Sequence, residues 1–244
     1  MRTELATRYA GSLLGIGWVL LAPLLVLGIY AAIYLVIFPF KPEGLSSFAY
    51  VLYIFAGLAP FFTLSEALSL AVGSVVANKA VLSNVVFPID LVPPKAVLSA
   101  QGPMVVGYTL MLAGVIAIGK ISWTLALLPV IWGLNILFLI GLAWFLSLLN
   151  IVFRDLQNLI TAALMILLIA SPIVYTPDRV PSNLKFLILA NPFAYFVIAY
   201  QRIWILGELP TLFQLAVIVV MSLGTFALGG WFFSRAKGVL IDYV

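Results

Sequence analysis

The chain has 244 residues, of which 65% are apolar and only 8% are charged, and its mean hydropathy is +1.24. A soluble domain is about 25% charged, so this composition excludes an ordinary soluble enzyme. The sequence has no cysteine, which excludes disulfides and thiolate chemistry, and no histidine, the commonest general base and metal ligand. We expect no catalytic residue and no metal site. The net charge of +4 is modest, and its carriers lie between apolar runs, as in membrane-flanking segments rather than in a nucleic-acid patch.

Six apolar runs are long enough to cross a bilayer, which takes about 20 residues of helix. They predict an all-α, polytopic membrane protein with a single transmembrane domain over residues 1–244. The expected spans are about 18–38, 49–77, 96–118, 123–152, 156–174 and 212–233, the second of them interrupted by Pro60 and Glu66. The first run is too long for the core of a cleavable signal peptide and is therefore interpreted as a span.

The first 15 residues precede these spans and have a helical repeat. Leu5, Tyr9 and Leu13 recur every four residues, and Glu4 can pair with Arg8 one turn later. Such a segment is typical of a helix that lies in the membrane interface.

The connection over residues 78–95 carries a second amphipathic pattern. Its apolar positions fall on one helical face, its polar face carries Lys79, Ser83 and Asn84, and Pro88 ends it. The apolar positions are Val81, Leu82, Val85 and Val86. We expect a short helix on the cytoplasmic membrane surface.

The connection over residues 175–208 is the longest. It is apolar but broken at Asn191–Pro192, and it carries Arg202. Because irregular backbone at membrane depth must be covered by protein or water, two half-helices that dip in and return are favoured over a seventh span.

The Lys/Arg distribution favours a cytoplasmic N-terminus, although only weakly. With six spans the inner side carries seven such residues: Arg2, Arg8, Lys79, Lys95, Arg154, Arg235 and Lys237. The outer side carries five: Lys41, Lys120, Arg179, Lys185 and Arg202.

One segment comes close to a nucleotide-binding motif. Gly114 to Ile121 fits G-x-x-x-x-G-K except that Ile121 replaces the hydroxyl residue that binds Mg²⁺, and it ends an apolar span rather than following a strand. The chain therefore has no credible ATP site, and any ATPase must be a separate polypeptide.

Two features inside the spans have two interpretations each. Glu66 is the only charge well within a span, and it either serves coupling or substrate binding, or pairs structurally with a neighbouring hydroxyl. Tyr30, Tyr34 and Phe38 recur every four residues along one face of the first span. They form either an interfacial aromatic belt or a wall on which sugar rings stack.

Several segments together resemble the permease subunit of type-2 ATP-binding-cassette exporters for O-antigen, capsular polysaccharide and teichoic acid. The resemblance covers nearly the whole chain, although only seven residues precede Arg8, where family members usually carry a longer stretch. The matching segments are Arg8-Tyr9 with residues 12–18 and Pro23, residues 84–88, 150–156 and 171–175, and Asn191-Pro192.

The resemblance implies a homodimeric channel in the bacterial cytoplasmic (inner) membrane, with two copies of a nucleotide-binding subunit docked beneath it. ATP and Mg²⁺ would bind to those subunits, with no cofactor in this chain, and a lipid-linked polysaccharide would move outward. Spans 1 and 5 would line the path through Tyr30, Tyr34, Phe38, Thr161, Met165 and Tyr175. Residues 78–95, with Arg8, would couple to the ATPase, and residues 175–208 would form an outer gate at Asn191, Pro192 and Arg202.

Two alternatives remain open at this point. One is a permease of the same class for a small, lipophilic, drug-like substrate, since a lining with many aromatic and few charged residues suits either cargo. The other is a stand-alone proton-coupled carrier, which depends on Glu66.

Overall fold

The computed structural model describes residues 12, 15–37, 44–78 and 88–240, and every regular element in these ranges is a helix. This confirms the all-α prediction for that part of the chain. Elements η2 and η7 are π-helices, and the other η elements are 3₁₀-helices. In chain order the elements are η1 (Gly15–Gly17), α2 (Trp18–Ala32), η2 (Ile33–Ile37), α3 (Ser47–Val72), α4 (Ser74–Ala77), η3 (Ile89–Leu91), α6 (Val92–Ser99), α7 (Gly102–Ala117), η4 (Trp123–Leu127), α8 (Leu128–Val152), α9 (Leu156–Ala170), η5 (Pro177–Arg179), η6 (Ser182–Leu184), α10 (Lys185–Ala190), α11 (Pro192–Gln201), η7 (Arg202–Leu206) and α12 (Leu212–Leu240).

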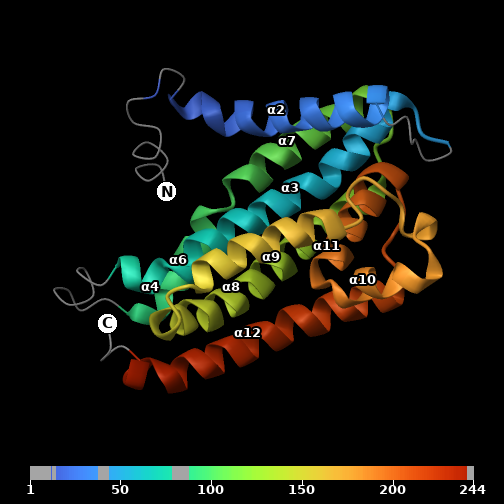
Figure 1. Ribbon diagram of the computed structural model, residues 1–244. Coiled ribbons are helices and arrows are strands. Elements are labelled where there is room, and N and C mark those ends of the chain that lie inside the picture. Colours follow the sequence, from blue (N-terminus) through green and yellow to red (C-terminus); the bar gives the residue numbers. More distant parts are fainter. Residues whose placement is uncertain (1–11, 13–14, 38–43, 79–87, 241–244) are drawn as a thin grey trace.

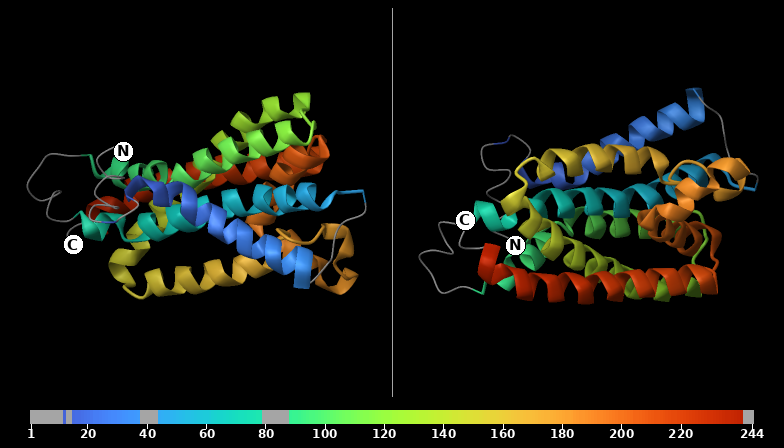
Figure 2. Two further views of the ribbon diagram at one scale, coloured as in Figure 1. Left: turned by 90° about the horizontal axis from the view of Figure 1, so that it is seen from above. Right: turned by 60° about the horizontal axis from the view of Figure 1, so that its bottom comes forward.

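The long helices run lengthwise beside one another between two ends of the molecule (Figure 1). One end holds α4, the start of α2, the turn between α8 and α9 and the end of α12, and we call it the α4 end. The opposite end holds α10, the start of α3 and the start of α12, and we call it the α10 end (Figure 2).

Helix α3 forms the centre of the bundle. Of its most apolar window, 78% is buried inside the protein, and α2, α7, α8, α9 and α11 all pack against it. Contrary to expectation, α3 runs unbroken through Pro60 and Glu66 as far as Val72. Proline is tolerated in a transmembrane helix when neighbouring helices support the backbone around it, and α3 is packed on several sides by other helices.

The connection predicted over residues 78–95 gives way to helix earlier than expected, at Ile89. The described residues resume at Pro88. From there η3 leads directly into α6, which has proline in its first turn. Proline at the start of a helix is favourable because the first N–H groups have no intrahelical partner. The third membrane run is therefore Ile89–Ala117, beginning earlier than the expected residue 96.

Helix α9 ends earlier than predicted. It stops at Ala170, four residues before the expected end of the span, because Pro172 follows Ser171 and disfavours helical backbone there. Ser171 is extended, with φ −78° and ψ 140°. Its hydroxyl donates to the Leu167 carbonyl at 2.6 Å.

The predicted break at Asn191–Pro192 is confirmed. The runs Ser182–Ala190 and Pro192–Leu206 meet there at an angle of 96°. Because α9 ends and α12 begins at the α10 end, this bent pair starts and finishes at the same end of the bundle (Figure 1).

Helix α12 packs along α8 at very short distance. A Cβ atom added to Gly229 would collide with the backbone of Gly141, and one added to Gly141 would collide with the backbone of Thr225. Small residues allow the two helix axes to approach in this way, as is common between membrane helices. Helix α12 also extends seven residues past the expected end at Phe233.

In the described ranges, four helical runs are long and apolar enough to cross a membrane: Ser47–Val72, Ile89–Ala117, Trp123–Val152 and Leu212–Gly238. The bent pair makes a fifth if it is counted as one span. The prediction of a multi-pass membrane protein is therefore confirmed for four to five spans.

Candidate transport path

The aromatic face predicted for the first span falls on α2 and η2 in the structure. Tyr30 and Tyr34 are half-buried, and their rings stack with centroids 6.1 Å apart and planes at 24°. This confirms that residues four apart share one face of the helix. Phe38, the third member of the predicted face, lies outside the described residues.

Helix α9 contacts α3 but buries little of its own surface. Leu164 is its one buried side chain, while a broad apolar face remains uncovered. This face comprises Leu159, Met165, Ile166 and Ile169, which are 63%, 65%, 68% and 80% exposed. Thr161 is also exposed, and its hydroxyl donates to the backbone carbonyl of Gln157 at 2.9 Å.

The segment after α9 is joined to the core at the α10 end. The hydroxyl of Tyr50 on α3 donates to the Val174 carbonyl at 2.9 Å. Tyr175 is half-buried and donates to the Ala170 carbonyl at 2.9 Å. Burial raises the pKa of the Tyr175 phenol, so this group stays a neutral donor.

The bent pair is fixed to the same segment by two buried amides. Asn191 accepts a hydrogen bond from the Phe193 N–H at 2.9 Å, which caps α11, and donates to the Ser171 hydroxyl at 2.9 Å. The Gln201 amide nitrogen lies 2.9 Å from the Ile173 carbonyl oxygen and 3.1 Å from that of Pro172.

Sequence reasoning singled out Asn191 but missed Gln201. A buried glutamine in an otherwise apolar membrane segment was the available signal, and Gln201 is 1% exposed. Gln201 therefore holds the C-terminal end of α11 against the extended chain that follows α9.

Arg202, the predicted charge of the outer gate, forms an ion pair with a near neighbour. Its guanidinium lies 2.8 Å from the Glu208 carboxylate, and the two side chains are 29% and 54% exposed. Gly207 lies between them with φ +67°, a left-handed turn that favours glycine. Pro192, the other gate residue, opens α11.

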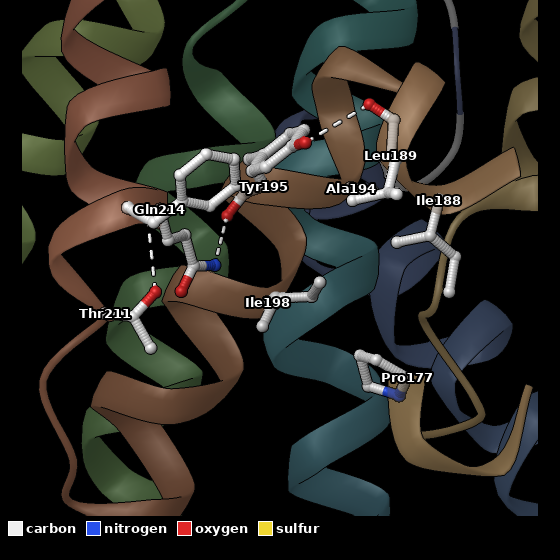
Figure 3. Close-up of a pocket in the computed structure, with 9 residues that line it drawn as sticks. Pro177, Ile188, Leu189, Ala194, Tyr195, Ile198, Thr211 and Gln214 are labelled. Atoms are coloured by element: carbon white, nitrogen blue, oxygen red, sulfur yellow. Dashed lines mark hydrogen bonds between the residues drawn. The ribbon is translucent and has the colours of Figure 1, made fainter. Parts of the chain in front are cut away.

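An apolar cavity of about 210 Å³ lies between the bent pair and the start of α12 (Figure 3). Its polar edges are already satisfied, since Gln214 donates to the Tyr195 carbonyl at 2.9 Å and Tyr195 donates to the Leu189 carbonyl at 3.2 Å. Drug-sized ligands occupy clefts of about 300–1,000 Å³, so the cavity is smaller than such sites.

The remaining predicted residues are distributed as follows. Glu66 is half-buried on α3 and has an interaction partner within the protein. Arg8, Lys79, Val81, Leu82, Val85 and Val86, the predicted coupling residues, lie outside the described residues.

Comparison with known proteins supports the resemblance drawn from the sequence motifs. Residues 96–205 match the family described as ABC-2 type transporter. These residues include α7, α8, α9, α10 and α11, and so contain both the exposed face of α9 and the bent pair.

Three curated proteins are similar along most of the chain. An O-antigen export system permease protein RfbA of Myxococcus xanthus is 27% identical over 225 residues, which cover 91% of this chain and 85% of that protein. Two proteins of the same name from Klebsiella pneumoniae are 25% and 24% identical over 209 and 215 residues, each covering 84% of this chain and 78% of the relative. The chain is therefore similar to the ABC-2 type transporter family over residues 96–205 and, over most of its length, to O-antigen export permeases.

Proposed function

We propose that this chain is the membrane-spanning subunit of an ATP-driven exporter that moves a lipid-linked polysaccharide across the bacterial cytoplasmic membrane. The observation that carries the proposal is the similarity to O-antigen export permeases over 84% to 91% of the chain. It favours a polysaccharide over a small lipophilic substrate, and it favours an exporter subunit over a stand-alone carrier.

The proposed topology has six crossings, with the α4 end in the cytoplasm. Four crossings are the long runs named above. The fifth is the continuous helix made by α2, of 15 residues, and η2, of 5 residues. Helix α9 forms a shorter sixth crossing. The bent pair then dips into the membrane from the outer side and returns. Arg154, Arg235 and Lys237 belong to elements at the α4 end, consistent with the positive-inside rule.

The proposed path lies between two copies of the chain. The exposed apolar face of α9 contrasts with the well-covered α3, and in the proposed dimer a second copy would cover part of it. Tyr30 on α2 and Tyr34 on η2, with Thr161, Met165 and Tyr175, would line the route on which sugar rings pack. The bent pair, held by Asn191 and Gln201, would close the outer mouth.

Energy would enter at the cytoplasmic face from a separate ATPase subunit, where ATP and Mg²⁺ bind. The proposed contact is the amphipathic pattern at Val81, Leu82, Val85 and Val86, because an apolar helical face is a common anchor in a partner's groove.

The test is to place a charge on that apolar face. Leu82→Asp and Val85→Asp should release the ATPase subunit during purification and abolish polymer export in cells, while the permease still inserts, because no span is altered. Ser83→Asp is the matched control, since it adds the same charge on the polar side of the same segment. Unchanged partner binding and export in both apolar-face variants would overturn the proposed coupling.

A further inference from the structure

At the α4 end, the two flanks of the proposed coupling segment lie in one small apolar cluster. Val75 in α4 precedes the segment and Ile89 in η3 follows it, and both pack with Leu148 of α8 and Phe233 of α12. Val75, Leu148 and Phe233 are at most 1% exposed. The segment is therefore anchored on both sides to the same two helices.

An ion pair lies beside this cluster. The Lys237 ammonium on α12 donates to both carboxylate oxygens of Asp90, each at 2.7 Å, across 147 residues of sequence. The Trp144 indole on α8 donates to the backbone carbonyl of Asp90 at 2.9 Å. One residue of η3 is thus held by α12 through its side chain and by α8 through its backbone.

Trp144 also completes the contact between the two helices. Its ring packs against Phe226 of α12 with centroids 5.1 Å apart. Asp90, Trp144 and Lys237 therefore join η3, α8 and α12 at a single place, two residues beyond Pro88.

The ion pair contributes little to holding the fold together. The side chains of Lys237 and Asp90 are 34% and 41% exposed, and exposed ion pairs add little to folding stability. The extensive α8–α12 packing already fixes these helices. A bidentate contact at this position instead fixes where η3 lies relative to the end of α12.

We propose that Asp90 and Lys237 are positioning residues that transmit movement of the segment between α4 and η3 to α8 and α12. This inference rests on the proposed function, in which that segment meets the ATPase. Movement of the segment would displace η3. The Asp90–Lys237 ion pair and the Trp144 hydrogen bond would transmit that displacement to α12 and α8, the two most tightly packed helices of the bundle.

The test compares Asp90→Asn, Lys237→Gln and the charge exchange Asp90→Lys with Lys237→Asp. Asparagine keeps the size of the side chain and leaves the Trp144 bond to the backbone carbonyl. We expect each single variant to keep the ATPase subunit bound and hydrolysing ATP, and to keep the wild-type melting temperature. Polymer export should fall about fivefold or more, the lower limit for energetic coupling between two sites.

The charge exchange should restore export to near the wild-type level. It would not do so if the single variants impaired export for a reason other than loss of the ion pair. Arg235→Gln is the matched control, because it removes one exposed positive charge from the same turn region of α12 and leaves the Asp90 pair intact.

Wild-type export in Asp90→Asn, loss of the ATPase subunit in that variant, or failure of the charge exchange to restore export would each overturn the inference. The proposed function would fail differently, through a wild-type protein that neither binds an ATPase subunit nor exports polymer.

Discussion

The α8–α12 pair and helix α9 show two opposite kinds of membrane surface in one chain. Glycines bring α8 and α12 into backbone contact, whereas α9 leaves four large apolar side chains more than 60% exposed. Lipid provides no hydrophobic force for helix association, so membrane helices pair through close fit. The first surface is complete within one copy of the chain, and the second is suited to contacts outside it.

The largest effect should come from breaking the close pair. In Gly229→Ala the added Cβ meets the backbone of Gly141, which cannot move aside as a side chain does. Overpacking of this kind costs about 1–3 kcal/mol and sometimes more, so we expect lower abundance and a lower melting temperature in detergent. Gly224→Ala on the same helix is the control, because no atom lies within 4 Å of its added Cβ. Equal stability of the two variants would contradict the close fit.

The next effect concerns what the exposed face of α9 contacts. Met165 on α9 and Val220 on α12 are 65% and 70% exposed, and the chain has no native cysteine. If α9 lines a path that carries water and the outer face of α12 meets lipid, as proposed, Met165→Cys should react with a membrane-impermeant thiol reagent about tenfold faster than Val220→Cys. Similar, slow reaction at both positions would place α9 against lipid.

A smaller effect is expected on the aromatic face of α2 and η2. Tyr34→Ala removes one ring of the stacked pair with Tyr30. Export should fall roughly two- to tenfold, the change that about 0.5–1.5 kcal/mol of ring packing represents. Dimer formation should be unchanged in cross-linking, and Tyr34→Phe should retain export. Loss of dimer in Tyr34→Ala would instead give this face a structural role.

The smallest effect is expected at Glu66 on the central helix. Glutamine keeps the hydrogen-bonding oxygen and removes the charge. Glu66→Gln should therefore export polymer at nearly the wild-type rate, measured at matched protein levels. Abolished export would give the charge a role in proton or substrate transfer.

Local sequence patterns were sufficient for most helices and for one decisive break. Apolar run length located the four long membrane runs, and Asn191–Pro192 located the bend because proline cannot continue the preceding helix. The four-residue repeat placed Tyr30 and Tyr34 on one face. Each of these features depends on neighbours within one or two turns.

Features that depend on distant contacts were missed or misjudged. Pro60 leaves α3 unbroken because the surrounding helices support it. The Asp90–Lys237 pair joins residues 147 positions apart, and no periodicity indicates such a pair. Gln201 likewise gains its role from carbonyl groups 28 and 29 residues away.

The length of α9 has a consequence for the bilayer itself. Fifteen residues of helix extend about 22 Å, against a hydrocarbon core of about 30 Å. A bilayer thins around a hydrophobic segment that is shorter than its hydrocarbon core. In the proposed dimer, two copies meeting at this helix would therefore reduce the thickness of hydrocarbon that a polar polymer has to pass, at the place where the extended backbone of Ser171 follows the end of the helix.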